Sequence, residues 1–247
     1  MVKITYCIKK RSGIKENELI KKLQGIFIPK VFASFTAPTS IVKCVISMTG
    51  SIQRIGIPPR KYDALIDFWV NCSDTIQEVI YSNKFKKLQK DCSAFINWGK
   101  SQFILTEELS PVFDADVATR IGQKPLIRFT TLLIRNQHLT FDEFRTHHKE
   151  RHIKLFSSVP VIQKNVKRYV VSHSIFTDDE RKPFEKYDGI VEFWFDNIGD
   201  AMRIFIDPVY LSRVRPDEHR FLELKKCDFV ISKELPPIRN IEYANSN

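Results

Sequence analysis

The sequence predicts an α+β protein made of two ferredoxin-like βαββαβ repeats, which together form a pseudo-dimeric α/β barrel within one chain. The first observation is a repeated string, because KYDALIDFWVN begins at Lys61 and KYDGIVEFWFD begins at Lys186. The second is that the same shift of 125 residues aligns other parts of the chain, and that it becomes 126 where FILTEEL matches FVISKEL. One shift that aligns the start, the middle and the end indicates an internal duplication of domain size.

The duplication divides the chain into four predicted segments. They are a first ferredoxin-like repeat at 1–109, a linker at 110–125, a second repeat at 126–235, and a polar tail at 236–247. Two copies of roughly 110 residues each fit the usual size of a domain.

The elements of the second repeat can be assigned in order from pattern and composition. The apolar spacing over 140–156 predicts a helix, with Thr140 as N-cap and Glu143 at capping-box distance. Strands are expected where β-branched and aromatic residues gather, at 126–135, 166–175, 187–195 and 227–235. A second helix is expected over 198–214, broken or kinked near Pro208.

The first repeat shows the same order, with its first helix at 17–27. A βαββαβ unit forms an antiparallel four-stranded sheet with both helices on one face. The other face of each sheet is then bare, and we expect the two bare faces to pack on each other.

Alternation along the strand at 189–195 predicts what the bare face carries. Val191, Phe193 and Phe195 share the purely apolar side, which suits a helix-covered face, and Glu192 and Trp194 point the other way. The first repeat places Asp67 and Trp69 at the equivalent positions. The prediction is a cavity between the sheets that is lined by these four residues. The alternative is that Asp67 and Glu192 form sheet-face ion pairs with Lys3 or Arg128.

Composition narrows the class of protein. No apolar run approaches the ~18 residues of a membrane span, and the N-terminal residues alternate like a strand and not like a signal peptide. Five cysteines without a C-x-x-C motif indicate reduced thiols and a cytoplasmic protein. The net charge is +10, but basic residues are mixed with acidic ones, and the aromatic motif of RNA-binding sheets is missing. We therefore expect neither a membrane nor a nucleic acid as partner.

Histidines distinguish the two repeats. The second has HHKERH at 147–152, where the first has KLQGIF at 22–27. Because both copies share the same backbone demands, the fold does not require these histidines. His148 and His152 lie four residues apart on the stripe that faces the sheet, but no acidic residue of this stripe supplies a third metal ligand, so no metal is expected. We interpret His147 as solvent-facing.

The second repeat resembles the EthD family of dimeric α/β-barrel proteins. The resemblance covers nearly all of this repeat and rests on matched positions, which are Arg151, His152, Arg168, Tyr169, Asp188, Gly189, Glu192, Trp194, Phe195, Asp196, Asp217, Glu218 and Phe221. It departs from the family at His148, where a Trp is frequent, and the first repeat matches only in KYDALIDFW. The resemblance implies the α/β-barrel fold, and it is compatible with a homodimer of the fused barrel.

The resemblance implies function only loosely, since relatives include polyketide cyclases, dehydratases, decarboxylases and cofactor-independent monooxygenases. Glycine is scarce and no phosphate-binding loop is present, so we expect no cofactor. The favoured hypothesis is a lyase-type or isomerase-type enzyme that acts on a small apolar, aromatic or polyketide-like molecule by acid–base chemistry. Cyclisation, dehydration, decarboxylation and isomerisation are all compatible with it.

Within this hypothesis His152 is the candidate base, His173 is a second candidate, and Glu192 would return the proton. His173 is equally compatible with a core histidine. Substrate contacts are expected from Trp194, Tyr169, Asp67, Trp69, Thr130 and His148. Two alternatives stay open, a non-catalytic barrel that binds a small molecule or is merely structural, and a cofactor-free monooxygenase. The first repeat would serve as scaffold.

Overall fold

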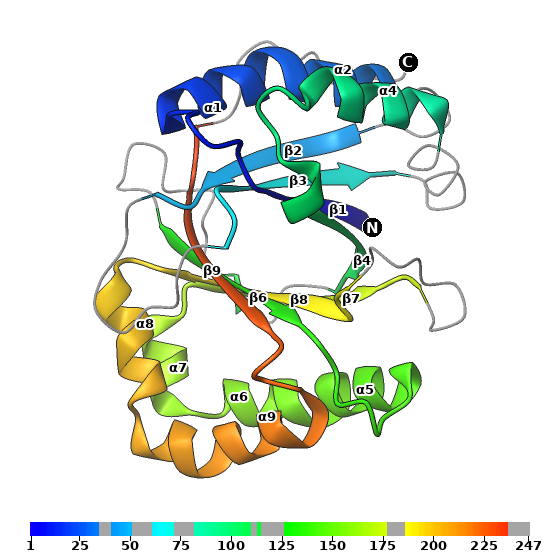
Figure 1. Ribbon diagram of the computed structural model, residues 1–247. Coiled ribbons are helices and arrows are strands. Elements are labelled where there is room, and N and C mark those ends of the chain that lie inside the picture. The colour runs from blue at the N-terminus through cyan, green and yellow to red at the C-terminus, as the bar shows by residue number, and fades with distance from the viewer. Residues whose placement is uncertain are drawn as a thin grey trace. The chain divides into compact units, whose positions relative to one another are not determined.

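A computed structural model describes residues 1–34, 41–50, 61–71, 82–109, 113–114, 126–176 and 186–236 (Figure 1). The chain forms two compact units. Of the described residues, the first unit contains 1–34, 41–49, 61–71, 82–105 and 235–236, and the second contains Gly50, 106–109, 113–114, 126–176 and 186–234. Of the predicted linker only Phe113–Asp114 is described, and of the predicted tail only residue 236, so these two predictions fall largely outside the described residues.

The first unit contains a sheet with the strand order β4-β1-β3-β2, in which β3 pairs antiparallel with β1 and with β2. Figure 1 shows α1, α2 and α4 on one face of its strands. In chain order the elements are β1 (Val2–Ile8), α1 (Glu16–Lys22), a π-helical turn (Leu23–Phe27), α2 (Ile28–Ser34), β2 (Ile41–Met48), β3 (Ala64–Val70), α4 (Asn83–Cys92), a 3₁₀ turn (Trp98–Lys100) and β4 (Gln102–Glu108).

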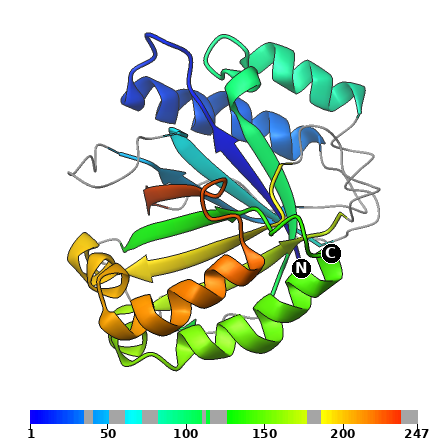
Figure 2. The ribbon, with the colours of Figure 1, turned by 60° about the horizontal axis from the view of Figure 1, so that its bottom comes forward.

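The second unit has the strand order β9-β6-β8-β7-β5, and residues 106–108 of β4 also pair with β7. Its helices lie together on one face of this sheet (Figures 1 and 2). In chain order the elements are β5 (Phe113–Asp114), β6 (Ile127–Leu133), α5 (Phe141–His147), a π-helical turn (His148–His152), α6 (Ile153–Ser157), α7 (Pro160–Asn165), β7 (Arg168–Ser174), β8 (Gly189–Phe195), α8 (Ile198–Phe205), a second π-helical turn (Tyr210–Val214), α9 (Arg215–Phe221) and β9 (Asp228–Glu234).

The structure confirms the predicted start of the helix at 140–156. The Thr140 side chain accepts a hydrogen bond from the Glu143 backbone N–H, and the Glu143 carboxylate accepts one from the Thr140 N–H, which completes a capping box. The predicted break near Pro208 is also present, because α8 ends at Phe205 before the next helical segment.

The bounds of matching elements recur at the shift found in the sequence. β1 and β6, α1 and α5, and β3 and β8 begin and end 125 residues apart, and β4 and β9 lie 126 residues apart. The first π-helical turn of each unit obeys the same shift, since Leu23–Phe27 corresponds to His148–His152. These bounds support the predicted duplication. That the two sheets pack face to face stays a prediction.

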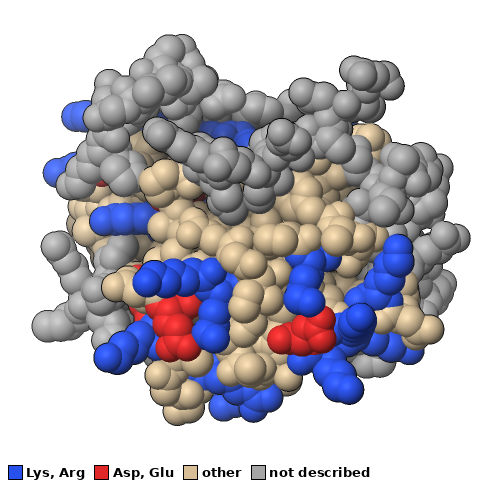
Figure 3. All heavy atoms as spheres, turned by 90° about the horizontal axis from the view of Figure 1, so that it is seen from above, with Lys and Arg blue, Asp and Glu red and all other residues tan. Residues whose placement is uncertain are grey.

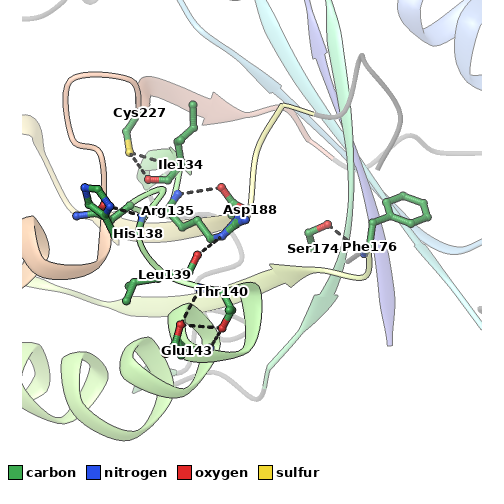
Figure 4. A network of polar contacts seen from close by, with 11 residues as sticks. Ile134, Arg135, His138, Leu139, Thr140, Glu143, Ser174, Phe176, Asp188 and Cys227 are labelled. Carbon is green, nitrogen blue, oxygen red and sulfur yellow. Dashed lines mark hydrogen bonds and ion pairs between the residues drawn. The ribbon is translucent and has the colours of Figure 1, made fainter. Parts of the chain in front are cut away.

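The aspartate of the repeated Tyr-Asp pair has the same structural role in both units. Asp188 accepts a hydrogen bond from the Arg135 backbone N–H at 2.8 Å, and its other oxygen lies 3.3 Å from the Arg135 guanidinium (Figure 4). In the first unit Asp63 accepts from the Lys10 backbone N–H at 3.0 Å. Each aspartate fixes the backbone directly after the first strand of its unit. The similarity of these two stretches is therefore explained by a shared backbone conformation.

Strand alternation in β8 follows the prediction. Val191, Phe193 and Phe195 belong to the apolar core beneath the helices of the second unit, together with Phe144 and Phe221. Glu192 and Trp194 point to the opposite face of the sheet, where Trp194 packs against Leu126 and Val170. The apolar side of the strand therefore faces the helices.

At the start of β8 the two neighbouring strands come unusually close. A Cβ atom on Gly189 would lie 2.7 Å from the backbone oxygen of Ser172 in β7. Such a contact is too short for ordinary packing, so glycine lets β7 approach here. The cross-strand partner of Gly189 is His173, whereas the first unit pairs Met48 with Ala64 at the corresponding place.

The surface agrees with the interpretation of the charge. On the face drawn in Figure 3, acidic side chains lie among the basic ones. No helix in the described ranges is long and apolar enough to cross a membrane. Four of the cysteines, Cys7, Cys44, Cys92 and Cys227, carry free thiols, and burial raises the pKa of Cys44 to about 12.

Candidate active site

A cavity of about 60 Å³ lies within the second unit, between its helices and the helix-covered face of its sheet. One water molecule needs ~10–15 Å³ of such space, so the cavity holds more than a single water. Most of its wall is aromatic or aliphatic, including Phe156, Tyr169, Val191, Phe193, Phe221 and Phe229. Its polar members are Thr131, His148, His152, Tyr210, Arg215 and Glu218.

The two cavity histidines lie on the π-helical turn between α5 and α6. Such turns occur frequently at functional sites. Here, however, the first unit has the same turn with Leu23 and Phe27 in place of His148 and His152. The wide turn therefore belongs to the fold of both units, and the chemistry comes from the side chains that it carries.

His152 is buried and is held by a carboxylate from a distant part of the chain. Its Nδ1 lies 3.0 Å from Oδ2 of Asp217, which belongs to α9. An ionised carboxylate can only accept, so Nδ1 donates, and in the neutral ring Nε2 has no proton. Among the residues that the structure describes, Nε2 of His152 has no hydrogen-bond partner, and it is free to act as a base.

Several positively charged or polar groups surround the carboxylate of Asp217. Burial acts to raise its pKa, but the hydrogen bonds from His152 and His147 outweigh burial and hold the pKa below its ordinary value. Arg151 and Arg220 also lie 3.4 and 3.7 Å from its Oδ1. A buried aspartate that stays ionised can fix the orientation of His152 and stabilise its imidazolium form.

The structure differs from the sequence-based interpretation of His147. Its Nε2 lies 3.1 Å from Oδ1 of Asp217, and its ring stacks on Phe221 at a centroid distance of 4.9 Å. His147 is therefore half-buried and shares the carboxylate with His152. The sequence did not show this because Asp217 lies 70 residues further along the chain.

His148 and His173 form a second buried pair. Nε2 of His173 lies 3.1 Å from Nδ1 of His148, so one ring donates a hydrogen bond to the other. Burial, followed by the neighbouring histidines, lowers the pKa of His148 well below its ordinary value. Burial, followed by the charges of Arg145 and Lys149, lowers the pKa of His173 to about 4. Both rings are therefore neutral at neutral pH.

This pair is expected to make the unfolding free energy depend on pH. Between the ordinary pKa of 6.5 and the folded pKa of about 4, the unfolded chain binds a proton at His173 that the folded protein does not. The unfolding free energy should fall as pH drops through this window, by about 3 kcal/mol for His173 alone. Urea unfolding of the wild type and His173→Gln at several pH values measures the difference. Equal pH dependence of the two proteins would contradict the prediction, and the exposed His138→Gln serves as control.

A second polar group of the cavity is formed by Tyr210, Arg215 and Glu218. The Tyr210 hydroxyl donates to Oε1 of Glu218 at 2.9 Å, and the Arg215 guanidinium lies 2.8 Å from Oε2. Burial raises the pKa of Glu218, against the opposing influence of Arg215 and His152. Glu218 therefore stands near both Arg215 and His152 in one apolar chamber.

The structure brings some predicted site residues together and separates others. His148, His152 and Tyr169 line the cavity, and His173 lies behind His148. Thr130, Glu192 and Trp194 lie on the opposite face of the same sheet. Glu192 forms a buried ion pair with Arg128, which was the alternative drawn from the sequence, and Trp194 donates to Glu234 at 2.8 Å. The structure therefore does not place Glu192 beside His152.

The remaining predicted residues belong to the first unit. Asp67 accepts a hydrogen bond from the Thr5 hydroxyl at 2.6 Å. The ammonium groups of Lys3 and Lys43 lie 5.7 and 4.5 Å from the centre of a Trp69 ring. Neither residue lines the cavity of the second unit.

Sequence reasoning assigned no role to several residues of this site, namely Asp217, Glu218, Tyr210 and Arg215. Asp217 and Glu218 were visible as matched positions of the family pattern. Tyr210 lay within the predicted second helix and Arg215 directly after its end, and no role was assigned to either. In the described part of the chain, no group of three or more His, Cys, Asp or Glu side chains is arranged to hold a metal ion.

Comparison with known proteins agrees with this description. Residues 136–225, which contain the cavity histidines, Asp217 and Glu218, match the model of the EthD domain. Dehydratase aurZ of Gibberella zeae is 29% identical over 125 residues, which cover 46% of this chain and 81% of that protein.

Two solved structures show a shared fold over nearly the whole chain. An anthrone oxidase-like protein superposes with a TM-score of 0.63 at 10% identity, over 95% of this chain and 91% of its own. A mutant chlorite dismutase from Candidatus Nitrospira defluvii gives a TM-score of 0.53 at 10% identity, over the same shares of the two chains.

Proposed function

We propose that the second unit is a cofactor-independent enzyme that removes water from a small apolar, aromatic or polyketide-like molecule. The observation that carries the proposal is the His152–Asp217 pair at the wall of an apolar cavity. The dehydratase relative supports elimination of water over cyclisation, decarboxylation or isomerisation, which use the same groups.

The reaction begins when Nε2 of His152 takes a proton from the carbon next to a carbonyl group. Asp217 accepts from Nδ1 throughout and stabilises the imidazolium that forms. The electron pair of the broken C–H bond is first held as an enolate on the carbonyl group, and it then forms the C=C bond as the β-hydroxyl leaves. The imidazolium then returns its proton to the departing hydroxyl, so one enone and one water are released and His152 is neutral again. No co-reactant is needed.

The wall of the cavity selects the class of substrate. Its aromatic rings offer flat contact surfaces, as in the stack of Tyr169 on Phe193 with a centroid distance of 4.8 Å. Glu218 and Arg215 form a small polar group that can orient an oxygen-bearing substrate. A planar, mostly apolar molecule with a few oxygen atoms fits this lining.

The overall arrangement belongs to the same proposal. We infer that the two units are ferredoxin-like copies and that the first one, without histidines at Leu23 and Phe27, serves as scaffold. The matching element bounds and the two strand orders support this. A cytoplasmic location and a homodimer of the chain remain predictions.

The test uses the aldol adduct of benzaldehyde and acetone as probe. In heavy water, proton NMR follows exchange of the methylene protons beside the carbonyl, and ultraviolet absorption follows formation of the conjugated enone. The wild type is expected to accelerate both. Leu224→Trp, which fills the cavity wall, should abolish both, whereas Leu211→Trp on the exposed surface should not.

Three outcomes would overturn this proposal. If the wild type accelerates neither reaction, the alternative of a non-catalytic binding protein is favoured. If Leu224→Trp is as active as the wild type, the chemistry lies outside the cavity. Exchange accompanied by uptake of oxygen, measured with an electrode, would replace dehydration by the monooxygenase alternative, because the carbanion left by His152 is the species that oxygen would attack.

A further inference from the structure

We propose that His148 is a second catalytic residue, which donates its Nε2–H to the carbonyl oxygen of the substrate and stabilises the enolate that His152 creates. This inference rests on the proposed function and names a distinct role within it. The role depends on which nitrogen of His148 carries the proton, because Nδ1 contacts His173.

His148 lines the cavity beside His152. It lies four residues before His152 on the same π-helical turn, and both rings line the cavity. Their centroids are 5.6 Å apart. The carbonyl oxygen and the carbon that loses the proton are two bonds apart, so two rings at this spacing can contact the oxygen and the C–H at once, each at ordinary hydrogen-bond reach of ~3 Å.

The tautomer of His148 depends on its contact with His173. Nδ1 of His148 is bonded to Nε2 of His173, which does not line the cavity. If His173 donates, Nδ1 of His148 is the acceptor, and a neutral His148 must carry its proton on Nε2. Among the described residues that atom has no partner, so a donor is available to the cavity. In the reverse arrangement both cavity histidines would offer only acceptors, and nothing on the turn would stabilise an oxyanion.

His152 and His148 lie in contrasting environments. Asp217 accepts from Nδ1 of His152 and so leaves Nε2 of the neutral ring without a proton, as a base requires. His148 is surrounded by Phe144, Phe221 and two other histidines, and it has no carboxylate partner among the described residues. A ring in such surroundings stays neutral, and a neutral imidazole can donate a hydrogen bond without losing its proton. Two histidines on one turn thus have opposite roles.

His173 is a positioning residue in this scheme, because it acts through His148. Its ring packs edge-on against Phe144 at 5.5 Å and is held where β7 approaches Gly189. Replacing His173 by Gln keeps an N–H donor for Nδ1 of His148, and replacing it by Leu removes that donor. The Gln variant should therefore keep more of the catalytic rate than the Leu variant.

The first measurement is the tautomer of His148 in the wild type, read at neutral pH from long-range proton–nitrogen correlation NMR. The signal is assigned by its absence in His148→Phe. A proton on Nε2 supports the proposal. A proton on Nδ1, or a charged ring, overturns it without any assay of activity.

The second measurement is proton exchange and dehydration of the benzaldehyde–acetone adduct. His148→Phe keeps an aromatic ring among aromatic neighbours but removes the donor, and both rates should fall by ~10²–10³. His148→Gln, which retains an N–H donor, should recover part of the loss. Equal rates of His148→Phe and the wild type overturn the role of His148 while the proposed function stands. A wild type that catalyses neither reaction overturns both.

Discussion

Replacing His152 by alanine is expected to reduce the rate of proton exchange and dehydration by a factor of ~10²–10⁴, which is the usual cost of losing a general base. The variant leaves Asp217 without one donor, but His147, Arg151 and Arg220 remain within 3.1 to 3.7 Å of this carboxylate. The lost hydrogen bond should therefore lower the unfolding free energy by only about 1–2 kcal/mol. Assays of the benzaldehyde–acetone adduct and thermal melting measure the two effects separately.

His152→Phe is the matched variant, since Phe27 occupies the same place on the π-helical turn of the first unit. It should fold and be as inactive as the alanine variant. His138→Ala, which changes an exposed histidine, should leave both quantities unaltered. His147→Ala should lose a modest part of the rate, because His147 shares Asp217 with His152. An active His152→Ala ends the proposal, and a collapse of the melting temperature in both His152 variants would assign the residue to the core.

The second large effect is expected on stability. Arg128 and Glu192 form an ion pair in which the two side chains are 1% and 2% exposed. Arg128→Met replaces the cation by an apolar side chain of similar length, so the buried Glu192 carboxylate loses this partner. The loss should lower the unfolding free energy by about 3–5 kcal/mol. Urea unfolding measures the loss. Arg203→Met, which breaks an exposed pair with Asp200, should cost well under 1 kcal/mol.

The double variant Arg128→Met/Glu192→Leu provides the decisive control. Replacing both charges by apolar groups of similar size also removes the buried carboxylate that has lost Arg128, so much of the stability should return. If the double variant is no more stable than Arg128→Met, the ion pair is not the cause. If it is stable but inactive, Glu192 takes part in catalysis, as the sequence predicted, and the helix-side cavity is not the whole site.

How much of this could be predicted from sequence depends on the range of the interaction involved. The capping box at Thr140 and Glu143 is local, and the facing of Val191 and Glu192 follows from a period of two. Those predictions are confirmed. His152 and His148 were identifiable because the first repeat supplies an internal comparison. The periods of a helix and a strand predict which faces carry His148, His152 and Tyr169, but they do not predict that a cavity lies between those faces.

The sequence did not show which side chains accompany His152. Glu192 was grouped with His152 because a carboxylate on a bare sheet face indicates a lined cavity, but the two side chains lie on opposite faces of the sheet and Glu192 pairs with Arg128. A catalytic role of Glu192 stays a prediction. The partner of His152 is Asp217, 65 residues away on another helix. No periodicity connects two side chains that meet only through the packing of α9 on the π-helical turn.

The close approach of β7 and β8 at Gly189 makes the history of this site dependent on the order of substitutions. In the first unit the corresponding cross-strand pair is Met48 and Ala64, and in the second it is His173 and Gly189. An alanine at 189 would collide with the backbone that carries His173. We therefore expect the effect of a substitution at 173 to depend on the residue at 189, which is epistasis through the spacing of two strands. Transplanting the histidines onto the first unit would require Ala64→Gly together with Met48→His, since neither change alone recreates the strand spacing and the imidazole.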